Sequence, residues 1–321
     1  MNILVVNCGS SSLKFQLIDS ETEQVSASGN CERIGLDGKI TYKAHGDKFV
    51  TETDLPEHGI AIKKVLELLV DKERGVINSL DEIHAVGHRM VHGGEKFSSS
   101  VVITEDVIKD IESCNDLAPL HNPANILGVR ACQEAMPGVK HVAVFDTAFH
   151  QTMPAKAYLY GLPKEYYEKY GVRRYGFHGT SHSFVSKRLA ELAGLDYNNS
   201  KMIVCHIGSG ASISAIKDGK SIDTSMGMTP LEGLVMGTRS GDIDPAIIEF
   251  ICQKENISVS EMTTILNKKS GVLGLSGVSN DFRDLVDARE SGNKDAANAL
   301  DVLVYRIVKY IGAYYMALGG V

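Results

Sequence analysis

The sequence predicts a mixed α/β fold built from layers of strands and helices. Short runs rich in β-branched residues alternate along the chain with segments that carry apolar residues at helical spacing. A strand, a Gly-Ser turn and a second strand occur near the N-terminus, and the same pattern recurs in the second half. The length of 321 residues suits two domains of about 150 residues each.

The elements follow one another in an order that favours α/β layers over a sandwich or a helical bundle. Strands are expected at NILVV, LKFQLI, VKHVAVF and KMIVCHI. Helices are expected at residues 60–70, 122–136, 181–194 and about 295–318, each with an apolar stripe at i, i+3 and i+4. Pro123 fits the first turn of the second of these helices.

An internal repeat indicates a duplicated domain. VNCGSSSLKFQLID at 6–19 aligns without a gap on CHIGSGASISAIKD at 205–218. Each copy would open with a β-hairpin, and both Gly-Ser turns would face one cleft. The alternative is a chance similarity between two hairpins. We therefore expect an N-terminal domain over 1–148 and a C-terminal domain over 149–321.

Composition and charge narrow the class of partner. The net charge of -7 and the absence of any Lys/Arg cluster longer than two residues argue against nucleic acid and anionic membranes. Six scattered cysteines without a CxxC pair are expected to be buried, reduced thiols. The charge favours a small substrate or a protein partner instead. No run of 18 apolar residues and no signal-peptide pattern occur, so a cytoplasmic location is expected.

The Gly-Ser turn of the first hairpin has the composition of an anion-binding nest. Ser10, Ser11 and Ser12 offer donors for phosphate oxygens, Lys14 offers charge, and Asn7 offers support for a magnesium-bound water. The alternative is an ordinary serine-rich hairpin. The sequence GxxxxGK[ST] is absent, which excludes a P-loop.

Further polar side chains lie where apolar strands end or where glycine-rich loops begin. In open α/β sheets, ligands gather at the carboxyl ends of strands, so these groups are candidates to converge. They are Arg89, His92, His121, Asp146, His178 and Arg239. The alternatives are surface ion pairs for the arginines and a turn-forming role for the aspartate. A metal site at His88/His92 or His178/His182 is disfavoured, because HExxH needs a helix and a Glu.

Taken together, several separated blocks resemble the acetate kinase family in their order along the chain. The blocks are VNCGSSSLKF, HRMVHGG, LAPLHNP, FDTAFH, RRYGFHGTSH, DTSMGMTPLEGLVMGTRSGDIDP and SGVSNDFRD. The resemblance implies two duplicated actin-like (ribonuclease H-like) domains with the site in the cleft between them. The N-terminal domain would form the acyl-substrate side and the C-terminal domain the nucleotide side. It further implies reversible phosphoryl transfer between ATP and acetate, giving ADP and acetyl phosphate, with Mg²⁺ or Mn²⁺ and as a homodimer.

The resemblance also assigns roles to residues. Arg89 and Arg239 match arginines that hold the acetate carboxylate and the phosphoryl oxygens, and His178 matches a histidine bonded to the transferring phosphoryl group. His121 matches a supporting histidine, Asp146 an aspartate near acetyl phosphate, and Asn7 the residue near the metal. The implied acetate-methyl pocket is Val91, Leu120, Phe177 and Pro230. The implied nucleotide-binding residues are Ser10, Ser12, Lys14, His206, Gly208, Ser209, Gly210, Asp281, Phe282 and Arg283.

Two departures from the family pattern bear on the nucleotide site. Ser209 stands where the family's second hairpin has an Asn. The family also continues beyond the position of Val321 with a strand, a Gly-rich loop, a metal-binding glutamate and a helix. We therefore expect the nucleotide site of this chain to be incomplete. The alternatives are a propionate kinase, which Val91 disfavours, a binding protein without turnover, and an acyl phosphatase.

Overall fold

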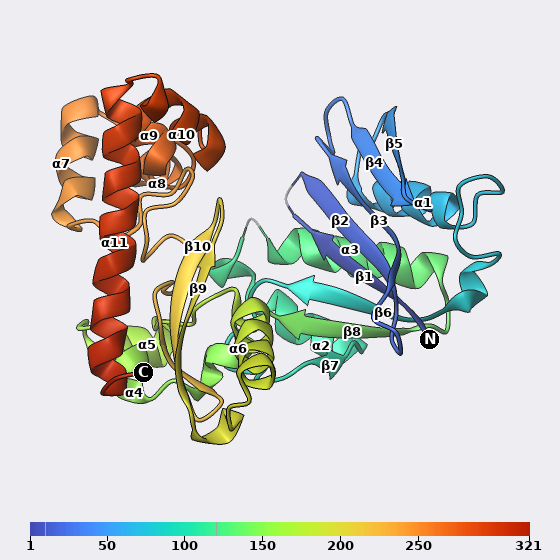
Figure 1. Cartoon of the computed structure of the whole chain (residues 1–321), viewed down its shortest axis with the longest axis horizontal. Helices are drawn as coiled ribbons and strands as arrows, with labels where there is room; N and C mark the ends of the chain where they lie inside the picture. The colour runs from blue at the N-terminus through green and yellow to red at the C-terminus, as the bar shows by residue number, and fades with distance from the viewer. Residues whose placement is uncertain (10, 120) are drawn as a thin grey trace. The chain divides into compact units, whose positions relative to one another are not determined.

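The computed structural model describes residues 1–9, 11–119 and 121–321, and it divides into two compact units (Figure 1). The units are Met1–Ala148 and Phe149–Val321, and each is described by itself. The assignment of an acyl-substrate side and a nucleotide side to them stays a prediction. Ser10 and Leu120, two of the predicted binding residues, lie outside the described residues.

In the described part of the first unit, eight strands form one sheet in the order β5-β4-β3-β2-β1-β6-β8-β7. β1 runs parallel to β6 and β6 runs parallel to β8, whereas the other neighbours are antiparallel. The strands are β1 Asn2–Cys8, β2 Ser12–Asp19, β3 Val25–Glu32, β4 Lys39–Ala44, β5 Asp47–Glu52, β6 Ile83–Met90, β7 Val101–Val102 and β8 Lys140–Phe145.

Two helices, α1 (His58–Leu69) and α3 (Asn122–Ala135), cover one face of this sheet (Figure 1). Their apolar stripes pack on the inward side chains of β1 and β2, such as Leu4 and Phe15. Gly128 lets α3 approach β1 closely, because a Cβ there would lie 2.4 Å from the sulfur of Cys8. A third helix, α2 (Glu105–Glu112), is capped by the hydroxyl of Thr104.

In the second unit, all of whose residues are described, three strands form a sheet in the order β11-β10-β9. They are β9 Lys201–Ile207, β10 Ala211–Lys217 and β11 Lys220–Thr224. Helix α6 (Gly179–Ala193) lies on one side of this sheet and the long helix α11 (Lys294–Leu318) on the other (Figure 1). The remaining helices are α4 Ala155–Tyr158, α5 Lys164–Tyr170, α7 Ala246–Glu255, α8 Val259–Lys268, α9 Gly271–Ser276 and α10 Phe282–Glu290.

The predicted strands and helices are present, with ends shifted by a few residues. The two aligned segments both form antiparallel hairpins, β1–β2 and β9–β10, which confirms that they share a strand–turn–strand structure. The prediction that all six cysteines are buried was wrong for Cys205, which is exposed, and for Cys252, which is partly exposed. Cys205 is exposed because β9 is an edge strand.

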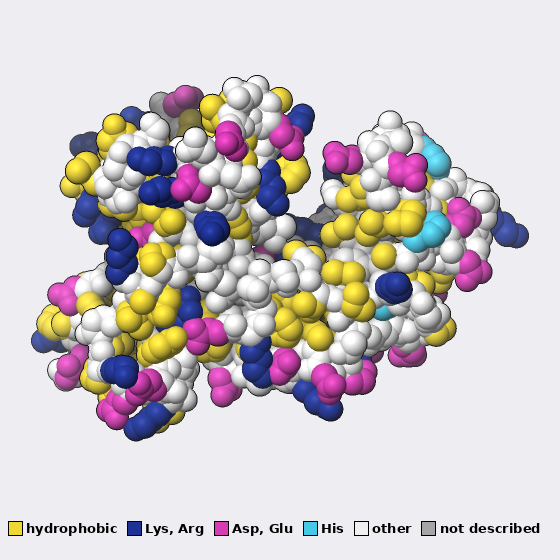
Figure 2. Space-filling view, turned by 90° about the horizontal axis from the view of Figure 1, so that it is seen from below, with side chains coloured by type: hydrophobic (Ala, Val, Ile, Leu, Met, Phe, Trp, Pro, Cys, Tyr) yellow, Lys and Arg dark blue, Asp and Glu magenta, His cyan; other side chains and the backbone are white. Residues whose placement is uncertain are grey.

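One face of the molecule shows how the charged side chains are distributed. On the face shown in Figure 2, Lys and Arg side chains are scattered among Asp and Glu rather than gathered in one block. In the part of the chain that the structure describes, no helix combines the length and apolarity needed to cross a bilayer.

Two strand glycines provide a test of the sheet packing. A Cβ on Gly29 in β3 would lie 2.2 Å from the carbonyl oxygen of Thr41 and 2.8 Å from the ring of Phe15. We expect Gly29→Ala to lower the free energy of unfolding by about 1–3 kcal/mol, because backbone and ring must both shift. Gly87→Ala in β6 is the matched control, since its Cβ would meet no atom within 4 Å. Urea unfolding that shows equal losses for both variants would contradict this packing.

Candidate active site

Three predicted residues of the first unit meet at the carboxyl ends of its parallel strands. Asn7 is on β1, Arg89 is on β6, and Asp146 directly follows β8. Arg89 Nε donates to Asp146 Oδ1 at 3.0 Å and Nη2 donates to Oδ2 at 2.5 Å. Arg89 Nη1 donates to Asn7 Oδ1 at 3.1 Å. The parallel register therefore brings residues 57 and 82 positions apart into one cluster.

The cluster keeps Arg89 charged and fixed in orientation. Asp146 is buried, with 3% of its side chain exposed, whereas 38% of the Arg89 side chain is exposed. Burial opposes the guanidinium charge, but the charge and hydrogen bonds of Asp146 outweigh it, so the pKa of Arg89 is raised. Three of the five guanidinium N–H groups bond to described residues. The other two are suited to an anionic ligand.

Two asparagines of α3 hold the ends of the strands that carry this cluster. Asn125 donates to the carbonyl of Cys8 at 2.6 Å and accepts from the amide of Val91 at 3.0 Å. Asn122 accepts from the amide of His92 at 3.1 Å and donates to its carbonyl at 3.0 Å. Both are buried. These two residues were not predicted from the sequence, although NPAN stands at the start of a predicted helix.

Two further predicted residues of this unit have defined positions. Val91, which directly follows β6, is 3% exposed, so its side chain belongs to the interior. His121 is the N-cap residue of α3, and its carbonyl accepts from the amide of Asn125 at 2.9 Å. Val91 therefore follows the strand that carries Arg89, and His121 precedes the helix whose asparagines hold the strand ends.

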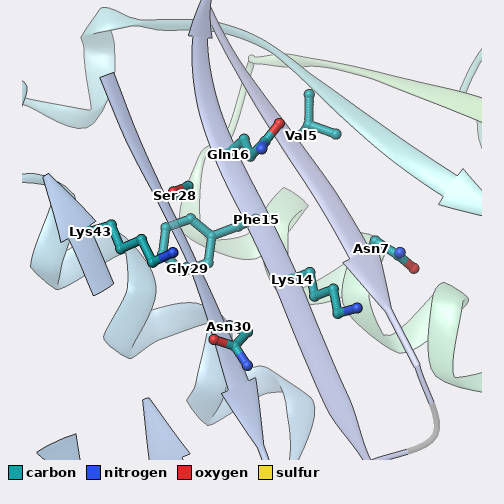
Figure 3. Close-up of a pocket in the computed structure, with 9 residues that line it drawn as sticks. All are labelled: Val5, Asn7, Lys14, Phe15, Gln16, Ser28, Gly29, Asn30 and Lys43. Carbon is teal, nitrogen blue, oxygen red and sulfur yellow. The ribbon is translucent and has the colours of Figure 1, made fainter. Parts of the chain in front are cut away.

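A cavity of about 440 Å³ lies on the sheet face that α1 and α3 leave uncovered (Figure 3). Lys14 on β2 is opposite Asn7 on β1 and opposite Asn30 on β3, so the three side chains form a row across the strands. Figure 3 shows Asn7 and Lys14 on neighbouring strands of this cavity. A cation flanked by two amides suits an anionic ligand. Ser12 begins β2, and its carbonyl accepts from the amide of Gly9.

In the second unit, His178 and Arg239 converge on Gly210. A Cβ on Gly210 would lie 3.5 Å from Arg239 Nη1 and 3.5 Å from His178 Nε2. His178 is the N-cap residue of α6 and has a left-handed backbone with φ of 58°. The absence of a side chain at Gly210 therefore leaves room beside a guanidinium and an imidazole.

The loop that carries Arg239 is long and is tied down at several points. Arg174 pairs with Glu232 and also donates to the carbonyls of residues 224–226. Asp242 accepts from Tyr310 of α11 at 2.6 Å and from the amide of Gly233 at 2.8 Å. These contacts were not predicted from the sequence, because they join segments far apart in the chain.

The remaining predicted residues of this unit flank the same loop. The Gly237 amide donates to the Ser209 carbonyl at 2.9 Å, and a Cβ on Gly237 would lie 3.2 Å from the Asn280 carbonyl. The Ser209–Gly210 turn and the segment before α10 therefore both border Gly237. Asp281 caps α10 and pairs with Arg283, whereas Phe282 packs against an apolar cluster.

Phe177 lies next to His178, and Pro230 lies next to Arg239. Phe177 is 2% exposed and directly precedes His178, and its carbonyl contacts His150 Nε2 at 3.0 Å. The carbonyl of Pro230 accepts from Arg239 Nη1 at 3.3 Å. His206 stacks on His178 with ring centroids 4.1 Å apart. His206, Phe177 and Pro230 are thus grouped around His178 and Arg239.

Few of the described side chains are placed to bind a divalent metal. Among the residues that the structure describes, no three His, Cys, Asp or Glu side chains form a metal-binding group. The Asn7 oxygen bonds Arg89, and both oxygens of Asp146 pair with the same guanidinium. These residues fit Mg²⁺ only in the manner usual for nucleotide enzymes, with most ligands supplied by phosphate and water.

The Arg89–Asp146 pair generates a stability prediction. Asp146→Ala leaves a partly buried guanidinium without its carboxylate, and we expect the free energy of unfolding to fall by about 1–3 kcal/mol, less than for a fully buried pair because Arg89 is partly exposed. Asp37→Ala, which removes the carboxylate of an exposed pair with Arg33, is the control and should change stability much less. Equal shifts in denaturant midpoint for the two variants would show that the Asp146 pair is not structural.

Comparisons with known proteins agree with this arrangement. The sequence profile of the Acetokinase family matches residues 2–321. The chain is 66% identical to an acetate kinase of Lachnoclostridium phytofermentans, covering 100% of this chain and 82% of that protein. It is also 66% identical to an acetate kinase of Agathobacter rectalis, covering 100% and 81%.

Two solved structures have closely similar folds. The crystal structure of Porphyromonas gingivalis acetate kinase has a TM-score of 0.95 and 53% identity, and it covers 100% of this chain and 81% of that chain. A propionate kinase from Francisella tularensis has a TM-score of 0.93 and 44% identity, with 98% and 80% covered. These matches confirm the predicted mixed α/β fold of acetate kinases. The chain belongs to the acetokinase family.

Proposed function

We propose that the chain catalyses reversible phosphoryl transfer between ATP and acetate, giving ADP and acetyl phosphate. The observation that carries this proposal is the Arg89 cluster, in which a buried aspartate and Asn7 fix a guanidinium that keeps two N–H donors for an anion. Relatives named acetate kinase at 66% identity over the whole chain support the same reaction.

The reaction requires the protein to position the reactants and to stabilise negative charge, and it does not require proton transfer. The moving phosphoryl group resembles metaphosphate and spreads negative charge over its oxygens. Arg89 would hold the acetate carboxylate and the phosphoryl oxygens, and Arg239 and His178 would donate to the same group in transit. Acetate is already ionised at neutral pH, so no general base is required. Asp146 would act by orienting Arg89, with His121 in a supporting role.

Nucleotide binding is proposed for the two hairpins and the segment before α10. Ser10, Ser12 and Lys14 of the first hairpin and His206, Gly208, Ser209 and Gly210 of the second would contact phosphates, and Asp281, Phe282 and Arg283 would lie at the adenosine. Mg²⁺ or Mn²⁺, when bound with the nucleotide, would neutralise phosphate charge, and Asn7 would orient one of its waters. We also propose a cytoplasmic homodimer.

Propionate phosphorylation is the second candidate, because the fold matches a propionate kinase closely. The proposed pocket for the acyl methyl group is Val91, Leu120, Phe177 and Pro230. One methylene is worth only about 1–3 kcal/mol in such a pocket, so both acids are expected to react. We expect kcat/KM to favour acetate. Equal or higher kcat/KM for propionate would reverse the assignment.

The activity test is hydroxamate trapping of acetyl phosphate with ATP, magnesium and acetate. We expect product from the native chain and a loss of about 10³–10⁵-fold for Arg239→Ala or Arg89→Ala, since each removes a charge from the transition state. Arg188→Ala, which alters an exposed ion pair on α6, is the control and should retain activity.

Three other outcomes would contradict the proposal. Thermal stabilisation by acetyl phosphate without turnover would indicate a binding protein. Loss of acetyl phosphate without ATP formation from ADP would indicate an acyl phosphatase. Full activity of Arg239→Ala would remove that residue from the mechanism.

A further inference from the structure

One buried hydroxyl lies between two imidazole rings next to the proposed phosphoryl site. Ser212 Oγ, on β10, is 2.9 Å from His178 Nδ1 and 2.8 Å from His182 Nε2. His178 caps α6 and His182 follows four residues later, so both rings reach the same strand. Ser212 and His182 are both 0% exposed. Water therefore does not replace either of these contacts.

A hydroxyl has one proton, which restricts how the three groups can bond. In the first arrangement, His182 donates from Nε2 to Ser212, Ser212 donates to His178 Nδ1, and His178 carries its proton on Nε2. In the second, all these directions reverse, and His178 Nε2 is a bare lone pair. An arrangement in which both rings donate leaves the buried Ser212 proton without an acceptor among the described residues.

The state of His182 separates the first two arrangements. Burial, followed by the neighbouring histidines, lowers the pKa of His182 to about 2, so the ring is neutral at physiological pH. Its Nδ1 atom is buried and has no hydrogen-bond partner among the residues that the structure describes. The first arrangement makes this atom a bare acceptor, whereas the second makes it an N–H donor. Orphaned buried N–H groups are the rarer of the two, which favours the first arrangement.

We propose that Ser212 and His182 are positioning residues that hold His178 as the Nε2–H tautomer. The N–H of His178 is then presented at Gly210, where Arg239 Nη1 also lies. The stacked ring of His206, whose Nδ1 is 2.8 Å from the Ser181 hydroxyl, packs against His178 and restricts its rotation. The catalytic consequence rests on the proposed function, because only a protonated Nε2 can donate to a phosphoryl oxygen.

The tautomer can be measured directly in the full chain without any assay of activity. Two-bond ¹H–¹⁵N correlation spectra of ¹⁵N-histidine protein distinguish a protonated Nε2 from a protonated Nδ1, and the His178→Asn spectrum identifies the resonances of His178. We expect only Nε2–H in the native chain. A native His178 protonated at Nδ1 would overturn the proposal, and this measurement needs no variant of Ser212 or His182.

Variants of Ser212 provide a second test of the proposal. Ser212→Ala should produce a mixture of tautomers at His178, and Ser212→Thr, which keeps the hydroxyl, should restore the native state. Ser214→Ala is the matched control, because Ser214 is equally buried on β10 but bonds Ser221 and the Asp223 carbonyl rather than these rings. An unchanged His178 spectrum in Ser212→Ala would also overturn the proposal.

Kinetics distinguish failure of this inference from failure of the proposed function. If the chain is an acetate kinase, Ser212→Ala should lower kcat by between about 10- and 1,000-fold, with little change in the KM for acetate. Ser212→Thr should recover most of the loss. A native chain without turnover would refute the proposed function while the tautomer measurement still decides the inference. A kcat that does not change in Ser212→Ala would contradict the positioning role of Ser212 but not the proposed function.

Discussion

The first unit depends on the buried carboxylate of Asp146 and the need to compensate its charge. Arg89 provides the opposite charge, and its Nη1 donates a hydrogen bond to Asn7 Oδ1. The parallel strands β1, β6 and β8 must therefore end in register for the cluster to form. The α3 asparagines fix two of those strand ends through the backbone. A single ion pair therefore links sheet register, helix placement and the orientation of the Arg89 guanidinium.

In the second unit, Arg239 and His178 are also held in defined positions, but by a loop and a helix start rather than by strand ends. Arg239 lies in a loop without helix or strand, and its position is set by Arg174, Glu232, Tyr310 and the backbone of the Ser209 turn. His178 is positioned by the start of α6 and by Ser212. Polar contacts thus fix the guanidinium directly in the first unit, whereas in the second unit they fix the loop that carries it.

The sequence predicted the strand and helix order, the two hairpins and the main polar side chains, because periodicity and strand ends are local signals. It did not predict Asn125, Glu232 or Ser212, because their roles arise from contacts with residues 34, 58 and 34 positions away. The exposure of Cys205 was also missed, since edge and central strands have the same apolar pattern along the chain. The grouping of Arg89 with Asp146 followed from a general rule about strand ends, whereas its bidentate geometry required coordinates.

The proposed function requires that Arg89, Arg239 and His178 all bind one phosphoryl group. A crystal structure of the chain with acetyl phosphate tests it most directly. The account predicts that nitrogen atoms of all three side chains lie within about 2.7–3.2 Å of oxygens of that group. A structure in which acetyl phosphate contacts Arg89 while Arg239 and His178 bond only to protein would contradict it.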